Sequence, residues 1–327
     1  MKKTTFIQLF ATIALGGAMI TACSGDDGGG DGGSNYSPAS SKIGTTGKAL
    51  AGFGNLLQCT YGADGVPQKA YLNNNECEIT INGSKDVVVF VDGFTSTFYY
   101  TYNKQGYITK MQRKDTEGEN EYTYTYSNDR LVEIKRTQKK LKTEEKWDYV
   151  IKIEWQGGRV VKSISTMKGT NIKVWHGSNG TQTEINTYSY PTTPVKNTYA
   201  QPTLSFTTIL FFDGNINMDT EIFKAMANLF GKGMTELPSR IDYQWNVQYD
   251  DDGSTRSGSS YMTFDYGLNS DGTIAYETIN GTKYNYSYTS NFGAQLSTAL
   301  PQTETMIPMA TAAKETSTGL RHYEPIR

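Results

Sequence analysis

Two short stretches of alternating aromatic residues constrain this chain more than any other feature. They are Phe98, Tyr100 and Tyr102, and then Tyr122, Tyr124 and Tyr126. Because successive side chains of a strand point to opposite faces of a sheet, each trio lines one face. A turn and a return run follow each trio. Each unit is therefore predicted to be a β-hairpin.

The rest of the chain repeats this unit loosely. Hairpin turns are predicted where Gly, Asn and Asp cluster between strand-like runs. These turns are Asn82-Gly83, Gly157-Gly158, Gly177–Gly180, Asp250–Gly253, Asn269–Gly272 and Asn280-Gly281. The expected fold is all-β, an antiparallel hairpin meander of about 12–14 strands that forms a large barrel or a strongly curled sheet, because closure removes exposed edges.

One amphipathic helix interrupts the meander. Asn217 or Asp219 can cap its start, and Gly231 can end it. Its apolar stripe comprises Ile222, Phe223, Met226, Leu229 and Phe230. A single stripe in a β protein must be buried somewhere, so the helix is expected to act as a plug or lid against the aromatic sheet face.

The first residues read as a targeting segment. Lys2 and Lys3 precede an apolar run, and Ile20-Thr21-Ala22 leads to Cys23. This arrangement resembles the lipobox of bacterial lipoproteins, which implies cleavage before Cys23 and lipid on its thiol. The expected organisation is a signal peptide over 1–22, a flexible Gly/Asp/Ser-rich tether over 23–54, a β-barrel-like domain over 55–300 and a C-terminal tail over 301–327.

The tether sequence and the net charge limit where the protein is expected to be located and which partners it is expected to have. The sequence SGDDGGGDGGS after Cys23 resembles the surface-export tether of Bacteroidota lipoproteins, which implies an outer-membrane lipoprotein with exposure at the cell surface. Without Lys2 and Lys3, 29 basic and 33 acidic residues leave a net charge of −4. No nucleic-acid partner is expected, because that needs clustered Lys and Arg. The expected partners are the membrane, through the lipid, and a glycan or surface protein.

Two cysteines remain after the lipidation site. An exported location is oxidising, so a disulfide between Cys59 and Cys77 is allowed. Two buried free thiols are the alternative, because sequence cannot place the two side chains within bonding reach.

Several segments together resemble an uncharacterised lipoprotein domain family of gut Bacteroidota with a porin-like fold. They are ITAC with DDGGG, the hairpins YTYNKQGYITKM and YTYSNDRLVEIK, and the helix DTEIFKAMANLF. The resemblance implies a fold and an address in the cell envelope but no activity. The hairpins also resemble tyrosine–aspartate repeats of surface proteins, although their turns lack a consistent Asp-Gly.

No catalytic residue, metal site or cofactor is predicted. His176 and His322 have no visible partners for a triad or a zinc site. Asp250–Gly253 reads as a solvated turn, because the calcium-loop pattern would require Glu where Tyr261 stands. A glycoside hydrolase would need two facing carboxylates, which sequence cannot identify.

The aromatic rings are the best functional lead. They either fill the interior or, at positions such as Tyr99 and Tyr188, stand exposed to stack on sugars or partner chains. A membrane-spanning barrel is disfavoured, because its outward positions should be apolar. Here they are Thr123, Thr125, Lys152 and Glu154. We expect a noncatalytic glycan- or protein-binding module. A glycan hydrolase and a structural or assembly subunit of an outer-membrane complex are the alternatives.

Overall fold

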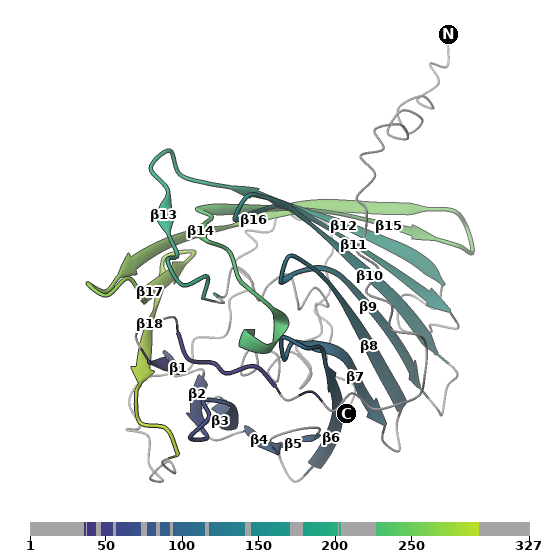
Figure 1. The fold of residues 1–327 in the computed structure, drawn as a ribbon. Coiled ribbons are helices and arrows are strands. Elements are labelled where there is room, and N and C mark those ends of the chain that lie inside the picture. The colour runs from purple at the N-terminus through teal and green to yellow at the C-terminus, as the bar shows by residue number, and fades with distance from the viewer. Residues whose placement is uncertain are drawn as a thin grey trace. The chain divides into compact units, whose positions relative to one another are not determined.

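The computed structural model describes one compact unit within Ser34–Arg327. The described residues are 36, 38–43, 47–54, 57–72, 77–82, 86–91, 94–114, 118–140, 145–170, 179–201, 203 and 227–293, with side chains except at 57, 71–97, 114 and 227–228. Within them, sixteen antiparallel strands form a closed barrel (Figure 1), and two more pair beside it. None of the helices described is both long and apolar enough to cross a membrane.

The strands run in chain order around the barrel, apart from the pair β13 and β14. The elements are β1 (Ala49–Phe53), β2 (Leu57–Tyr61), β3 (Pro67–Leu72), β4 (Cys77–Asn82), β5 (Asp86–Val91), β6 (Phe94–Tyr102), β7 (Ile108–Lys114), β8 (Gly118–Ser127), β9 (Arg130–Lys140), β10 (Lys146–Gln156), β11 (Arg159–Thr170), β12 (Gly180–Ser189), β13 (Val195–Lys196), the 3-10 helix η2 (Ala227–Phe230), β14 (Glu236–Leu237), β15 (Arg240–Tyr249), β16 (Thr255–Leu268), β17 (Ile274–Ile279) and β18 (Thr282–Thr289). The predicted all-β meander is confirmed.

Strand β1 closes the barrel, pairing with β18 on one side and β2 on the other. This corrects the expectation that residues up to 54 belong to the tether, because Ala49–Phe53 is a barrel strand. The glycines in and after β1 are compatible with a strand at this position. Gly52 lies beside a shift of register with β18, and Gly54 turns the chain with φ of 55°.

The aromatic trios lie on the inner wall, as the alternation predicts. Phe98, Tyr100, Tyr102, Tyr122 and Tyr124 are buried in one core cluster, and Tyr126 packs against it. The residues between them face outward, and Thr123 and Thr125 are exposed. Burying a large ring contributes about 1.5–3 kcal/mol, so the inner wall supplies much of the stability.

Tight turns join the strands where the sequence offers residues that tolerate positive φ. Asn128 and Asp129 have φ of 51° and 62° between β8 and β9, and Asn280 and Gly281 have 48° and 87° between β17 and β18. Two successive left-handed residues match the twist of a hairpin. Of the predicted turn Gly177–Gly180, residues 177 and 178 lie outside the described part of the chain, and Gly180 begins β12, which pairs with β11.

One end of the barrel is covered by chain, and we call it the capped end. Three segments, 38–43, 195–201 and 227–237, hydrogen-bond to the strand turns there. The backbone pairs are Ala39 N to Gly106 O at 2.9 Å, Ser41 N to Gly65 O at 2.8 Å, Lys232 N to Asp129 O at 2.8 Å and Thr235 N to Gly158 O at 2.8 Å. Each turn therefore has a partner in the cap, which satisfies its backbone polar groups.

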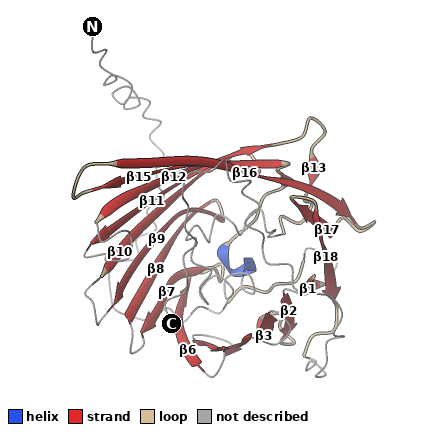
Figure 2. Ribbon diagram, turned by 180° about the vertical axis from the view of Figure 1, so that it is seen from behind, coloured by secondary structure: helices blue, strands red, loops and turns tan. Residues whose placement is uncertain are grey.

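The helix prediction needs correction. Its described end is a single 3-10 turn, η2, inside the ring of strands (Figure 2), and residues 204–226 lie outside the described part. No plug α-helix is therefore seen in the described residues. The burial is as expected, because Leu229 and Phe230 are fully buried and the Phe230 ring meets Tyr124 edge-on at 5.0 Å. Gly231, with φ of 85°, then turns the chain toward a bridge with Arg130.

Candidate functional site

The inner wall has two chemically different zones. Near the capped end it is almost entirely aromatic and aliphatic. Farther along strands β8 to β12, buried and half-buried polar residues replace the rings. We call this set the polar band, and its members are Asn120, Arg136, Ser163, Ser165, Glu184 and Asn186. Buried polar groups are costly unless they are paired, so their presence needs a reason.

Glu184 is the most unusual member of the polar band. Its cross-strand neighbours are Ser165 on β11 and Trp245 on β15. The residue is only 6% exposed, and burial raises the pKa of its carboxyl to about 8. Among the described residues the structure gives it neither a hydrogen bond nor an ion pair. A carboxyl in this state is predominantly neutral at pH 7 and is ready to accept a partner.

Asn186 lies two residues from Glu184 on the same face of β12. Its Nδ2 donates to Ser163 Oγ at 3.1 Å, which fixes the orientation of the amide. Its Oδ1 is buried and has no partner within the described part of the chain. Glu184 and Asn186 therefore present neighbouring acceptor oxygens on one stretch of wall.

Aromatic side chains border this pair on β15. Tyr243 stands opposite Asn186, and Trp245 stands opposite Glu184. The Trp245 ring lies against Gly258 on β16, 2.5 Å from where a Cβ would stand, so any larger residue would displace it. The lack of a side chain at Gly258 thus determines where the ring lies.

Arg136 forms a second polar feature, on β9. Its guanidinium lies over the rings of Tyr122 and Tyr149, at 5.0 and 5.1 Å from their centroids. Its Nη2 donates to Gln138 Oε1 at 2.8 Å and to Asn120 Oδ1 at 3.4 Å. Stacking between two rings holds the side chain flat against the wall.

The buried carboxylates do not form a hydrolytic pair. Among the described residues they are Glu145, Glu184 and Glu277. Glu145 is paired with Lys140 Nζ at 3.3 Å, and Glu277 accepts a hydrogen bond from Tyr286 Oη at 2.8 Å.

The strand register separates these carboxylates further. Gly258 stands level with Trp245 and so with Glu184, whereas Tyr266 stands level with Glu277. Eight residues of strand separate Gly258 from Tyr266, which corresponds to about 27 Å. Glycosidases need their two carboxyls about 5–10 Å apart, so Glu184 and Glu277 cannot act together on one bond.

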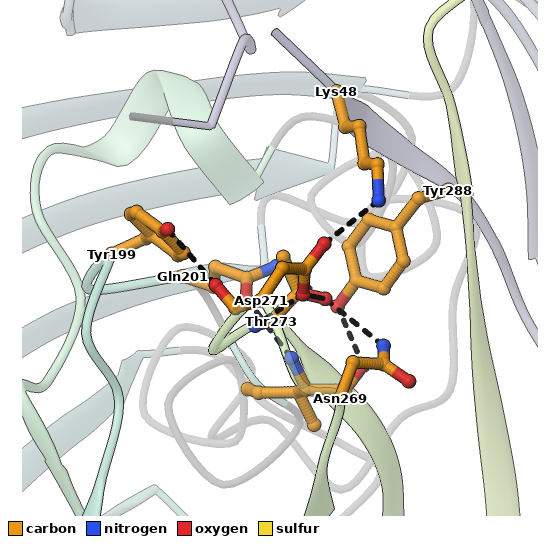
Figure 3. A network of polar contacts seen from close by, with 8 residues as sticks. Lys48, Tyr199, Gln201, Asn269, Asp271, Thr273 and Tyr288 are labelled. Carbon is orange, nitrogen blue, oxygen red and sulfur yellow. Dashed lines mark hydrogen bonds and ion pairs between the residues drawn. The ribbon is translucent and has the colours of Figure 1, made fainter. Parts of the chain in front are cut away.

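A polar network at the capped end has a structural role instead (Figure 3). Lys48 Nζ pairs with Asp271 Oδ2 at 2.7 Å, and Tyr199 Oη donates to the Asp271 carbonyl at 3.0 Å. Gln201 Nε2 donates to Tyr288 Oη at 3.0 Å, and its Oε1 accepts from the Ile274 amide at 3.2 Å. The network ties the cap to β17 and β18, and its polar groups satisfy one another.

The predicted site residues have mixed outcomes. Cys23, His176 and His322 lie outside the described residues. Cys59 is a free, buried cysteine whose thiol has its pKa raised to about 12 by burial, so the disulfide is not formed here. The reason is topological. β3 separates the strands of Cys59 and Cys77, which puts their Cα atoms about 10 Å apart, beyond disulfide reach.

The two tyrosines expected to be exposed behave differently. Tyr99 is 53% exposed on the outer wall, as expected, whereas Tyr188 is buried on the inner wall. The predicted exposure of Tyr188 was therefore wrong. Glu184 and Asn186 were not identified from sequence at all. The available signal was their phase, because they stand four and two residues before Tyr188 and so share its face.

Comparison with known proteins gives a likeness of fold only. No protein-family model matches the chain, and no curated protein matches it. A porin-like protein from Bacteroides vulgatus is similar, with a TM-score of 0.45, 14% identity and coverage of 73% of this chain and 98% of its own. A porin-like protein from Bacteroides uniformis has a TM-score of 0.43, 16% identity and coverage of 71% and 89%.

Proposed function

We propose that this chain is a lipid-anchored protein of the cell envelope that binds a ligand without chemical conversion, on the polar band of the barrel's inner wall. The observation that carries the proposal is the pair Glu184 and Asn186. Glu184 is a buried residue with neither a hydrogen bond nor an ion pair among the described residues, and Asn186 Oδ1 is a buried acceptor with no partner there. A stable fold gains nothing from such groups, whereas a ligand would satisfy them.

The neighbouring rings support a glycan over other ligands. Sugars present apolar ring faces that stack on Tyr and Trp, and hydroxyls that pair with side-chain oxygens and amides. The polar band offers both, because Asn186 and Glu184 stand opposite Tyr243 and Trp245. The separation of the buried carboxylates supports binding over hydrolysis.

The outer wall supports an anchor in place of a membrane-spanning barrel. Its exposed positions include Lys152 and Glu154, and its ion pairs include Lys110–Glu121 at 3.1 Å and Lys146–Asp148 at 2.9 Å. A lipid-facing wall would be apolar there. We therefore propose that lipid on Cys23 tethers the barrel at the outer membrane, as the lipobox and the resemblance to the lipoprotein family imply.

Glycan binding is tested with the full chain in a zwitterionic detergent on an array of envelope and host glycans. We expect retention of at least one glycan class, and loss of that retention in a Glu184→Leu/Asn186→Leu double variant. Tyr99→Ala is the matched control, because Tyr99 lies on the outer wall and should leave retention unchanged. Retention that survives the double variant but fails in the control would place the binding face outside the barrel.

The anchor is tested separately. Cys23→Ser should move the protein from the detergent phase to the aqueous phase in a detergent partition, because no lipid could be attached. Cys59→Ser is the control, since this buried thiol is not a lipidation site. If partitioning of Cys23→Ser equals that of the parent chain, the lipid anchor is refuted.

A further inference from the structure

The oxygens that Glu184 and Asn186 leave without partners among the described residues are acceptors once Glu184 is ionised. Asn186 has its donor Nδ2 on Ser163 and leaves only its acceptor Oδ1. Glu184, once ionised, offers two more acceptors, and the Ser165 hydroxyl stands opposite it. A matching ligand must therefore bring several donors on one atom or on closely spaced atoms.

The side chains around Glu184 narrow the classes of ligand that could bind there. At its direct and diagonal cross-strand positions stand Ser163, Ser165, Met167, Tyr243, Trp245 and Val247. None of these described side chains is Lys, Arg, Asp or Glu, and Tyr243 is the one titratable group among them. The described cross-strand neighbours of Glu184 thus bring no positive charge to it, and a ligand that supplies one would favour its ionisation.

Other ligand classes fit less well. An anion would be repelled by Glu184 whenever that carboxyl is ionised. Calcium takes six to eight oxygen ligands, more than the described residues here provide. An uncharged sugar could pair its hydroxyls with a neutral Glu184 but would gain no ionic attraction from it. A primary ammonium has three N–H donors and a full charge, and the ring of Tyr243 or Trp245 can add cation–π attraction.

We propose that Glu184 and Asn186 form a subsite for a primary ammonium group, such as that of an amino sugar or of a lysine side chain, on a ligand held in the polar band. In this arrangement Glu184 Oε and Asn186 Oδ1 each accept one N–H, and Ser165 Oγ can accept the third. The inference rests on the proposed binding function and names the chemistry that the ligand carries.

Binding by this route is coupled to a proton. Glu184 must lose its proton for the ion pair to form, and the proton goes to solvent. With a carboxyl whose pKa is about 8, affinity for an ammonium ligand should rise about 50-fold between pH 6 and pH 8. A neutral ligand would show no such dependence.

The experiment is a titration calorimetry series on the full chain at pH 7. The probes are glucosamine, Nα-acetyl-lysine methylamide and glucose, and the lysine derivative is repeated at pH 6 and pH 8 because its amine stays protonated throughout. We expect one or both amines to bind and glucose to bind at least tenfold more weakly. Glucosamine alone would indicate an amino sugar, and the lysine derivative alone would indicate a protein side chain.

Two variants localise the effect. Glu184→Gln keeps the shape and should weaken amine binding at least tenfold while abolishing the pH dependence. Glu277→Gln changes a second buried carboxyl, which lies about 27 Å along the strands from the subsite, and should change neither the affinity nor its pH dependence. Failure of both amines, or equal binding of glucose, overturns the ammonium subsite. In that case glycan retention on the array still decides the proposed function independently.

Discussion

The capped end and the polar band share one inner wall but follow opposite rules. At the capped end the polar tips of three large rings donate to backbone carbonyls. Tyr126 Oη donates to Ile108 O at 2.6 Å, Trp155 Nε1 to Leu131 O at 2.8 Å and Tyr190 Oη to Val160 O at 2.7 Å. In the polar band, Glu184 and Asn186 keep acceptor oxygens that no described residue satisfies.

The difference separates stability from function. A zone whose apolar surface is buried and whose donors are paired contributes to the free energy of folding. A zone with unpaired buried oxygens lowers it, and such a cost persists where it serves binding. The same strands carry both zones, because each strand runs from one to the other.

Truncating a ring at the capped end should have the largest effect. Phe230→Ala removes a fully buried side chain from its contact with Tyr124 and should lower the free energy of unfolding by about 4 kcal/mol. Urea titration followed by tryptophan fluorescence measures it, with Tyr99→Ala as an exposed control. A loss under 1 kcal/mol would show that the cap contributes little to stability.

Replacing the Glu184 carboxyl with a neutral amide should raise the free energy of unfolding, in contrast to the truncation of Phe230. Glu184 has its pKa raised from 4.5 to about 8, so its contribution to stability is complete below pH 4.5 and is lost as pH rises to 8. Glu184→Gln removes that loss and should stabilise the protein by on the order of 3 kcal/mol at pH 7. At pH 4 the variant and the parent should match. Equal curves at both pH values would mean that Glu184 is solvated.

The loop of the cap should show an intermediate effect. Asn197 is fully buried, and its Nδ2 donates to Gln201 O at 2.8 Å and to Met234 O at 2.7 Å. Asn197→Ala leaves these carbonyls unpaired and should cost about 2 kcal/mol in the same urea titration. Asn197 Oδ1 also accepts from the Gln201 amide at 3.1 Å, and Asn197→Asp keeps this acceptor but not the donors, so it should recover little. Full recovery by Asp would indicate that only the amide of Gln201 matters.

The ion pair between Lys48 and Asp271 should have the smallest effect on the free energy of unfolding. Lys48 and Asp271 have side chains 43% and 31% exposed, so solvent screens their attraction. Lys48→Met should change the free energy of unfolding by about 0.5 kcal/mol or less. Raising the salt concentration should reduce even this difference. A loss above 2 kcal/mol would make this pair an essential clasp of the barrel.

Much of the fold was predictable from sequence because it depends on local pattern. Alternate rings predicted the inner face of β6 and β8, and paired turn residues predicted hairpins at Asn280-Gly281 and Gly157-Gly158. The helix was predicted from its 3.6-residue stripe, but its described end is one 3-10 turn. The boundary at residue 54 was wrong because β1 is too short and glycine-rich to be identified without its partners β18 and β2.

The candidate site was harder to predict from sequence than the fold, because it depends on the register between strands. Sequence phase places Glu184, Asn186 and Tyr188 on one face, but it cannot show that Ser165 and Trp245 stand opposite Glu184. Nor could spacing show that β3 separates Cys59 from Cys77. Both facts concern neighbours that lie far apart along the chain.

The sequence by itself determined the β-strand rhythm and which alternate side chains share a face, because these follow from alternation, and a local motif in it predicts a lipid anchor. Only the tertiary structure decided that the meander closes through β1, that chain covers one end of the barrel, and that Glu184 is buried without a charge partner among the described residues. Burial and pairing are properties of the assembled wall, since each strand determines what its neighbours can reach.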